Sequence, residues 1–564
     1  MVNIPGLISI LIFYALIFFI GLWAARKKKT GKGSKDDELL LAGRNIGYIV
    51  GAFTMTATWV GGGYINGTAE SVYLTGLVSA QAPWGYALSL VIGGILFAKK
   101  LREANYVTML DPLQEKYGIE MGAILYIPAL LGEIFWSAAI LSSLGATLSI
   151  ILGLRIDYAV IISALIAVGY TFFGGLYSVA YTDVVQLICI FFGLWITVPF
   201  AMTHAQVHKL ANTRKQWVGN IESRNLGVWL DSALLLVFGG IPWQVYFQRV
   251  LSAKSVKSAQ VLSFSAAVGC IIMSVPSILI GAVAKSTDWK KVLSDNSTQL
   301  TADGVIADSR LVLPMVLYHL TPTWVSFFGL GAVSAAVMSS ADSSVLSASS
   351  MFGNNIYKVL IRRKASSKEF LWVIRIGIIV VGVIATLMGL TITNIYDLWV
   401  LSSDLVYVCL FPQLLCAVYI KFVNVYGSAA AFVLAVSLRT LGGEKVLGIP
   451  IVIKYPYFNG AQQLFPFKTF AMVCSLITLV LVSIVANYLS KHYSKTSLSK
   501  DTDVILCSYK DDDINNVKSF SQISRWSGSY NNITASATEL RNRDERLLLK
   551  HKSTEKILLE TQEL

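Results

Sequence analysis

Charged residues are scarce in this chain. Asp, Glu, Lys and Arg make up 14% of its 564 residues, while hydrophobic residues make up 55%. Soluble globular proteins carry about 25% charged residues, so the composition excludes that class and indicates an all-α protein that crosses a membrane many times. The net charge of +13 is explained by basic clusters beside membrane segments. We therefore expect contact with membrane lipid and no nucleic-acid partner.

Cysteine and histidine are also few, with six and five residues. None of the cysteines has metal-site spacing or lies in an expected outer loop, so we expect no disulfide. The histidines fall in loops, in segments just before helices, or in the C-terminal tail. No nucleophile–base pair, phosphate-binding loop or metal motif is present, which argues against an enzyme and against an organic cofactor.

Long apolar runs are abundant instead. A helix needs about 20 apolar residues to cross a bilayer, and windows of that kind predict thirteen transmembrane helices. They lie near 5–25, 45–66, 79–98, 120–150, 157–176, 180–203, 230–250, 259–284, 324–357, 370–393, 396–420, 424–441 and 467–492.

Basic clusters set the expected orientation. The run at 26–29 follows the first apolar window, and such clusters stay in the cytoplasm, so we expect the N-terminus outside and the C-terminus inside. The first window has no basic segment before it and does not resemble a signal peptide. The loop at 285–310 is then outside, and Asn296, in the sequon at 296–298, is a candidate glycosylation site.

Two apolar windows are interrupted by glycine or proline. Residues 56–64 contain three consecutive glycines, and residues 238–243 contain two glycines and a proline. Three glycines cost about 3 kcal/mol relative to alanine in a helix, which favours unwinding. Transporters often bind substrate where two corresponding helices are broken. Five helices begin with each break, which predicts an inverted repeat of five plus five helices. The alternative is that the glycines only permit close packing.

Counting five helices from each helix break divides the chain into five segments. The first helix and a basic cytoplasmic loop occupy 1–44, the two repeats occupy 45–229 and 230–423, and two further helices occupy 424–493. The polar tail at 494–564 has the composition of a disordered segment. Within it, residues 544–549 resemble an acidic dileucine signal for endocytic adaptors, and a short amphipathic helix is the alternative.

Four aromatic residues lie at the breaks or inside other apolar windows: Trp59, Tyr86, Trp136 and Trp243. If their rings converge, they form a cage suited to a quaternary ammonium, which has no hydrogen-bond donor on its charged group and is held by cation–π attraction. A lone tryptophan in a membrane helix is more commonly an interface anchor or a packing element. Spacing alone does not decide between these interpretations.

Residues 331–350 are rich in serine within an otherwise small and apolar stretch. Hydroxyls and bared carbonyls are hard ligands of the kind that an alkali cation takes, so this stretch predicts the wall of an ion site. The ionisable residues within the expected spans could complete such a site or offset a cationic substrate. Helix capping is the alternative for Asp183, and a buried pair with an arginine is the favoured interpretation of Asp404. The other two ionisable residues are Glu133 and Asp342.

Five blocks of sequence resemble the sodium/solute symporter family, and within it the branch that carries choline. The similarity extends from about residue 5 to 493. The resemblance implies thirteen helices and an LeuT-like inverted-repeat core. The blocks that carry it are 51–70, 106–112, 178–187, 239–244 and 331–350.

The resemblance also implies binding residues. In that family the first broken helix and a later helix share one sodium ion, which on this chain implies carbonyl ligands from Ala57, Val60 and Ala336 and hydroxyl ligands from Ser339 and Ser340. The substrate cage of the choline-carrying members corresponds to the four aromatic residues named above.

Some members of the family bind a second sodium ion. Its position would correspond to Asp183, Asp342 and Ser343. Asp342 replaces a hydroxyl residue that is common elsewhere in the family, so the charge of the site would differ here. Choline-carrying members also depend on chloride, but no residue of this chain identifies a chloride site.

The function implied is sodium- and chloride-dependent, high-affinity choline uptake by alternating access across the plasma membrane. It would supply acetylcholine synthesis, with the protein in presynaptic terminals and synaptic vesicles. One alternative is a symporter of a sugar, proline or a vitamin, although sugar sites need many hydrogen-bonding groups where this chain has aromatic ones. The other alternative is a sodium sensor or channel, which would not accumulate a substrate.

Overall fold

The computed structural model describes residues 4–27, 40–173, 176–293, 299–392 and 394–495. The glycosylation candidate Asn296 and the segment 544–549 lie outside these residues. The described chain is helical, with isolated β-bridges and no strand. Its α-helices are α1 (Ile4–Lys27), α3 (Tyr48–Trp59), α4 (Gly62–Leu74), α5 (Ala82–Gly93), α6 (Lys99–Glu103), α7 (Asp111–Tyr117), α8 (Ile119–Leu152), α9 (Ile156–Phe173), α10 (Leu176–Met202), α11 (Arg214–Val218), α12 (Leu226–Gly239), α13 (Gln244–Ser252), α14 (Val256–Lys285), α15 (Trp289–Val292), α16 (Val312–His319), α17 (Thr323–Met351), α18 (Ser367–Thr391), α19 (Ile395–Leu405), α20 (Phe411–Tyr419), α21 (Val425–Leu441) and α22 (Phe467–Lys495).

The length and hydropathy of these helices suit a membrane. Among the described residues, nine helices are long and apolar enough to cross one, and three shorter apolar helices accompany them. The first broken window is divided between α3 and α4, neither of which is long enough to be counted alone. The protein is thus a polytopic helical membrane protein, and the number thirteen stays a prediction.

Among the nine candidate membrane helices of the described residues, the one that contains α17 has the largest buried share. Every residue from 329 to 351 is buried, and the helix packs against α1, α8, α9, α10 and α18. Small residues such as Gly, Ala and Ser allow this because they let neighbouring helix backbones approach closely. The serine-rich stretch is therefore inside the protein and not against lipid.

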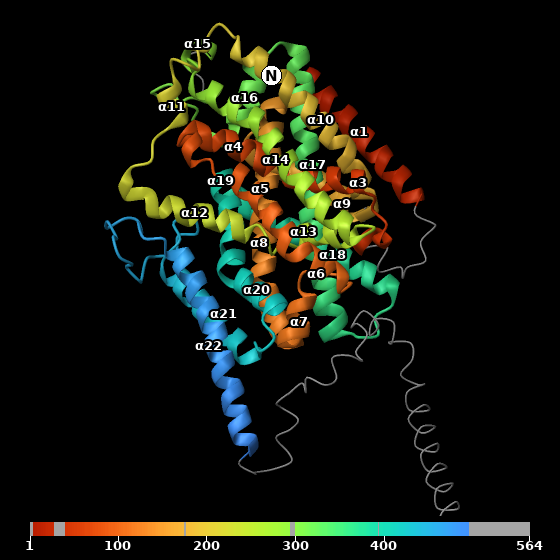
Figure 1. The fold of residues 1–564 in the computed structure, drawn as a ribbon. Coiled ribbons are helices and arrows are strands. Elements are labelled where there is room, and N and C mark those ends of the chain that lie inside the picture. Colours follow the sequence, from red (N-terminus) through yellow and green to blue (C-terminus); the bar gives the residue numbers. More distant parts are fainter. Residues whose placement is uncertain (1–3, 28–39, 174–175, 294–298, 393, 496–564) are drawn as a thin grey trace, which may run out of the picture. The chain divides into compact units, whose positions relative to one another are not determined.

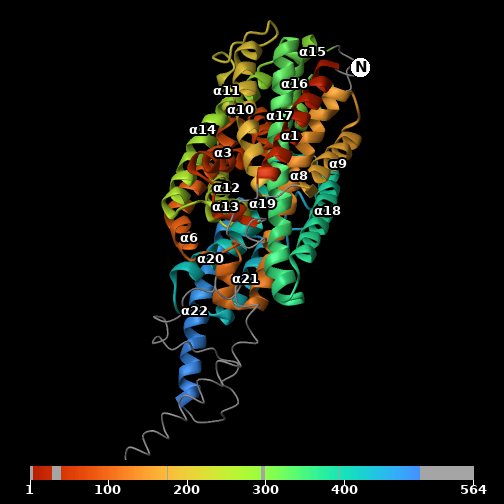
Figure 2. The same cartoon turned by 90° about the vertical axis from the view of Figure 1, so that its right-hand side faces the viewer.

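The short helices mark two opposite ends of the bundle. Helices α11, α15 and α16 lie at one end in both views (Figures 1 and 2), and α6 and α7 lie toward the other end in Figure 1. Helix α14 packs against α3, α4 and α5. In Figure 1 the helices that flank the two helix breaks, α3 and α4 and then α12 and α13, are labelled between these two ends.

Asp404 joins the last two helices to the rest of the bundle. Its carboxylate, buried on α19, accepts from Arg439 Nε on α21 at 2.7 Å and pairs with Lys468 Nζ on α22 at 2.7 Å. Two cations around one buried carboxylate offset the cost of removing it from water. The expected pairing of Asp404 with an arginine is confirmed.

Candidate functional site

The first helix break, between α3 and α4, leaves backbone carbonyls without helical hydrogen-bond partners. The last helical bond of α3 runs from the Val60 amide to the Thr56 carbonyl at 2.8 Å. Val60 then leaves the helical conformation with ψ 61°, and Gly61 is extended with φ −101° and ψ −169°. Because a helix end leaves its last carbonyls without intrahelical partners, the carbonyls of Ala57 and Val60 are free to bind another group.

The second break has the same form. Helix α12 ends at Gly239, and α13 begins at Gln244 after an extended Trp243 with φ −115° and ψ 132°. Pro242 lies between them and lacks the amide hydrogen that a continuing helix would need. The Trp243 indole nitrogen instead donates to the Gly239 carbonyl at 2.7 Å, which ties the ring across the break.

Gly61 lets the first break touch α17. A methyl group added at Gly61 would fall inside the Ser340 side chain, and the Ala336 carbonyl oxygen lies 3.7 Å from that position. The φ of Gly61 is ordinary, so the glycine is required by this close approach and not by its backbone angle. The structure thus brings the first break against Ala336 and Ser340, two of the three residues of α17 that were predicted to share a sodium ion with it.

The two serines of the predicted first sodium site point their hydrogens at other groups. Ser339 Oγ donates to Asp183 Oδ1 at 2.5 Å, and Ser340 Oγ donates to the Thr58 carbonyl at 3.1 Å. A hydroxyl has one hydrogen and two lone pairs, so both oxygens keep acceptor capacity for a cation. Ala57, Val60, Ala336 and both serines are fully buried.

The three residues of the predicted second sodium site are divided between two sets of partners. Asp342 Oδ1 accepts from Thr171 on α9 at 2.7 Å, and its other oxygen has no partner among the described residues. Asp183 and Ser343 instead share Arg249, whose Nη2 lies 2.5 Å from Ser343 Oγ and 3.6 Å from Asp183 Oδ2.

The structure also bears on the alternative role of Asp183 and on Arg249, which the sequence did not single out. Asp183 lies well inside α10 and accepts from Thr54 as well as Ser339, so helix capping is not its role. Arg249 precedes two further basic residues in the sequence, Lys254 and Lys257, and its side chain is fully buried. The single available signal was its position six residues after Trp243, within the second half of a broken helix.

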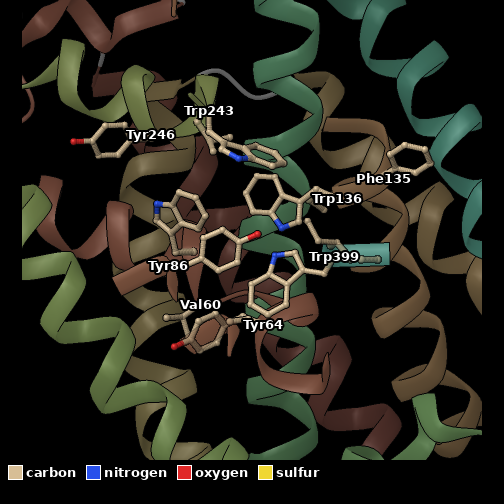
Figure 3. Packing of buried hydrophobic residues seen from close by; sticks show 14 of the residues in the cluster. Val60, Tyr64, Tyr86, Phe135, Trp136, Trp243, Tyr246 and Trp399 are labelled. Atoms are coloured by element: carbon tan, nitrogen blue, oxygen red, sulfur yellow. The ribbon is translucent and has the colours of Figure 1, made fainter. Parts of the chain in front are cut away.

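The four predicted aromatic rings lie together, and Figure 3 labels three of them, Tyr86, Trp136 and Trp243. The centroid of the Trp59 ring is 4.9 Å from that of Tyr86, 6.1 Å from that of Trp136 and 6.4 Å from that of Trp243. The Trp136 and Trp243 rings are 5.2 Å apart and nearly perpendicular, at 78°. All four residues are at most 4% exposed. We call these four residues the ring cluster.

A fifth ring, Trp399 on α19, was not predicted. It stacks on Tyr86 with 4.9 Å between ring centroids and an interplanar angle of 25° (Figure 3). The Tyr86 hydroxyl, on the same side, is hydrogen-bonded to Ser403 of α19. The one proline of its apolar window, Pro412, lies 13 residues after Trp399, so nothing local distinguished Trp399 from a packing residue.

Glu133 places a carboxyl group one helical turn from Trp136. Both residues are on α8, and both are nearly fully buried. Ser344 of α17 donates to Glu133 Oε2 at 3.1 Å, while Glu133 Oε1 has no partner within the described part of the chain. A buried carboxyl group with spare acceptor capacity near aromatic rings suits a cationic ligand.

On the side of the bundle where α16 lies, hydrogen bonds connect neighbouring helices to one another. The backbone amide of Tyr396 donates to Glu70 Oε2 on α4 at 3.0 Å, and Ser309, just before α16, also bonds to this carboxyl group. The Tyr396 hydroxyl accepts from the Gln81 amide at 3.0 Å and donates to the Ser79 carbonyl at 3.2 Å. These bonds join α4 and α19 to residues 79–81, just before α5.

A different set of hydrogen bonds connects the helices on the side of the bundle where α7 lies. Ser347 Oγ of α17 donates to Gln248 Oε1 of α13 at 3.1 Å. Nearer α7, the Thr108 hydroxyl donates to Asn355 Oδ1 at 2.7 Å. The ring cluster, whose four residues are buried, therefore lies between two sets of hydrogen bonds, one on the side of α16 and one on the side of α7.

The chain is similar to known transporters. The model of the sodium:solute symporter family matches residues 39–434. "High-affinity choline transporter 1" of Drosophila melanogaster is 57% identical over 486 residues, which are 86% of this chain and 78% of that protein. The transporter of the same name from Caenorhabditis elegans is 55% identical over 516 residues, 90% of this chain and 89% of that protein. "High affinity choline transporter 1" of Homo sapiens is 55% identical over 505 residues and 86% of both chains.

A solved structure shares the fold. It is the substrate-bound, outward-open state of a Na⁺-coupled sialic acid symporter, which superposes with a TM-score of 0.67 and 17% sequence identity. The match covers 85% of this chain and 98% of that one. At this level of identity the likeness concerns the arrangement of helices and not the substrate.

Proposed function

The chain belongs to the sodium:solute symporter family, as a transporter and not an enzyme, and from that premise we propose that it carries choline into the cell together with sodium. The substrate assignment rests on the ring cluster, which includes a tryptophan at each of the two helix breaks. The names of the most similar relatives support the same substrate.

The ring cluster suits a quaternary ammonium for electrostatic reasons. A trimethylammonium group cannot donate hydrogen bonds of the N–H type, so a polar site gains little by surrounding it. Each desolvated aromatic face contributes about 1–2 kcal/mol of cation–π attraction instead. Glu133, one turn from Trp136, would add a negative charge at short range. A sugar symporter is the weaker alternative because the candidate positions are aromatic.

Sodium supplies the driving force in this proposal. An ion held by the carbonyls of Ala57, Val60 and Ala336 and the hydroxyls of Ser339 and Ser340 would join the first break to α17. Choline binds beside the same break through Trp59, so sodium and choline each strengthen the binding of the other, as linkage requires. The membrane potential adds about 2.3 kcal/mol per charge per 100 mV for inward movement.

The two sets of hydrogen bonds on either side of the ring cluster are the proposed gates. Release of the Glu70–Tyr396 bonds would open the cluster to the outside. Release of the Gln248–Ser347 bond and its neighbours would open it to the cytoplasm. Alternation between these states carries the substrate without a continuous pore, which separates this proposal from a sodium channel or sensor.

The wider setting is proposed from the family resemblance. We propose two five-helix repeats at 45–229 and 230–423, an outer N-terminus, a cytoplasmic C-terminus and thirteen helices in all. Transport would require chloride and would supply acetylcholine synthesis from the plasma membrane and synaptic vesicles of presynaptic terminals. Glycosylation at Asn296 and recognition of 544–549 by endocytic adaptors belong to the same proposal.

Uptake of labelled choline by cells that express the chain tests the substrate and both ions together. We expect saturable uptake at micromolar choline, which is lost when sodium is replaced by an inert cation and reduced when chloride is replaced by gluconate. Labelled proline and glucose serve as substrate controls in the same cells. A chain that reaches the surface and carries either of these instead of choline would refute the substrate assignment.

Replacing Ser339 with alanine should separate sodium binding from choline binding. Loss of one oxygen contact to a charged group costs about 1.5–3 kcal/mol, so the sodium concentration for half-maximal uptake should rise roughly tenfold or more. At saturating sodium the choline KM should change much less.

The matched control is Ser334→Ala. Ser334 is buried on the same helix, and its hydroxyl has no partner among the described residues, so its loss should leave the sodium dependence unchanged. A choline KM that rises in the Ser339 variant while the sodium dependence stays constant would move the sodium site elsewhere.

A further inference from the structure

Arg375 is a charged residue on a helix that mostly faces lipid. It lies on α18, eight residues after Ser367, the first residue of that helix, which is about 12 Å along the helix axis. Only 33% of the apolar part of α18 is buried inside the protein. A cation at such a position is costly unless another group offsets its charge, and arginine stays protonated in proteins.

Two aromatic rings hold the guanidinium group of Arg375. Its central carbon lies 5.1 Å from the centroid of the Phe172 ring on α9 and 5.3 Å from that of the Trp372 ring on α18. Nε is buried and has no hydrogen-bond partner among the described residues. The rings attract the cation through their faces, but they accept none of its N–H hydrogens in the way that an oxygen would.

The acidic residues of α18 and α9 are engaged elsewhere. The one acidic residue of α18, Glu369, pairs with Arg362 at 3.1 Å. The one acidic residue of α9, Asp157, lies in the first turn of that helix, whereas Phe172 lies in its last turn. The ion pairs of the described residues do not include Arg375. The positive charge of Arg375 is therefore available to an anion from outside the chain.

A second cation and a tryptophan share a face of α18 with Arg375. Lys368, Trp372 and Arg375 are spaced at i, i+4 and i+7, which places them on one side of a helix. Lys368 is exposed, and the Trp372 side chain is 55% exposed. Helical side chains lean toward the start of their helix, so Arg375 reaches over Trp372 toward Lys368. We call these three residues the basic face of α18.

The basic face lies where lipid headgroups are expected. Tryptophan is enriched at the level of the headgroups, and the basic run at 362–364 comes just before α18. In the orientation proposed above, this end of α18 is cytoplasmic, and the cytoplasmic leaflet contains the anionic lipids of a cell membrane. Further along α18, Ile376 and Ile379 are exposed apolar residues, which suit acyl chains and not a water-soluble anion.

We propose that the basic face of α18 binds the phosphate group of an anionic phospholipid in the cytoplasmic leaflet. The planar guanidinium of Arg375 matches two phosphate oxygens at once, and Lys368 adds a second charge. Two cations without a neighbouring carboxylate favour a headgroup with a net negative charge. Phosphatidylcholine suits the face less well because its own ammonium group balances its phosphate. The inference depends on the proposed orientation and not on the proposed substrate.

Native mass spectrometry of the full chain in detergent tests the proposal by counting bound lipids. Dioleoyl phosphatidylserine and dioleoyl phosphatidylcholine have the same acyl chains, so titrations with each compare the headgroups alone. We expect the first phosphatidylserine to bind at least roughly tenfold more tightly than the first phosphatidylcholine. Arg375→Gln should remove this preference, because a hydrogen bond to a charged group contributes roughly tenfold or more in affinity. Lys368→Gln should weaken phosphatidylserine binding roughly fivefold.

Lys491→Gln is the matched control. Lys491 is exposed near the end of α22, which is cytoplasmic in the proposed orientation, so the variant removes the same charge from another helix. Its preference for phosphatidylserine should equal that of the unaltered chain. Excess inorganic phosphate should not displace the lipid, and displacement would assign the basic face to a soluble anion instead.

Equal affinity of the unaltered chain for both lipids would overturn the lipid site. The same conclusion would follow from an unchanged preference in a monodisperse Arg375→Gln variant, or from equal losses in Arg375→Gln and Lys491→Gln. If Arg375→Gln does not fold, Lys368→Gln decides, because a preference that it leaves unchanged contradicts the basic face. None of these titrations contains choline, so they leave the substrate assignment to the uptake experiments.

Discussion

Trp59→Ala should raise the choline concentration for half-maximal uptake by roughly 30-fold. The indole is the ring that contacts all three other members of the ring cluster, at centroid distances of 4.9, 6.1 and 6.4 Å. A desolvated cation–π contact contributes about 2 kcal/mol, which corresponds to roughly 30-fold in affinity. Saturation curves with labelled choline measure this, with surface biotinylation to confirm that the variant reaches the membrane.

Two control variants make the result specific. Trp59→Phe keeps a smaller aromatic face, so its KM should lie between those of the unaltered chain and the alanine variant. Trp84→Leu removes a tryptophan from α5, the same helix that carries Tyr86. The Trp84 ring pairs with Trp229 at 6.0 Å and not with the ring cluster, so its KM should stay close to normal. Equal effects of Trp84→Leu and Trp59→Ala would contradict a cage at Trp59.

Gly61→Ala should reduce uptake at least roughly tenfold, and the loss should persist at saturating choline. The added methyl group would fall inside the Ser340 side chain, so the break and α17 must separate to accept it. Overpacking of this kind costs about 1–3 kcal/mol, and here it acts on the contact that the proposed sodium ion shares. The initial rate of uptake as a function of sodium concentration is the measurement.

Gly63→Ala is the matched control, two residues along the same glycine run. A methyl group there would meet Ala139 Cβ at 3.7 Å and the Trp399 ring at 4.0 Å, which are ordinary contacts. We expect uptake close to normal. Equal losses in both variants would mean that the flexibility of the glycine run matters, and normal uptake in Gly61→Ala would mean that Gly61 and Ser340 are not in close contact during transport.

The local features of the site were predictable because each depends on a short stretch of sequence. Consecutive glycines and a Gly-Gly-x-Pro segment disfavour a continuous helix wherever they occur, so both breaks could be placed without a structure. The cost of polar groups in a membrane predicted that the serine-rich stretch of α17 would not face lipid and that Asp404 would pair with an arginine.

What the sequence could not supply were contacts between distant helices. Trp399 stacks on Tyr86 across more than 300 residues of chain, and no periodicity encodes which face of α19 meets α5. Arg249 resembled part of a cytoplasmic basic cluster because neighbouring residues after it are basic. Its burial depends on Asp183 and Ser343, which are on two other helices.

Proteoliposomes that contain only the purified chain test the central claim most directly. With an inward sodium gradient and the membrane potential clamped at zero, the chain should accumulate labelled choline above the outside concentration and lose that gradient when sodium is equalised. Accumulation should be absent with an inward potassium gradient of the same size. Choline that only equilibrates across the membrane under every gradient would show a passive path and contradict sodium-coupled transport by this protein.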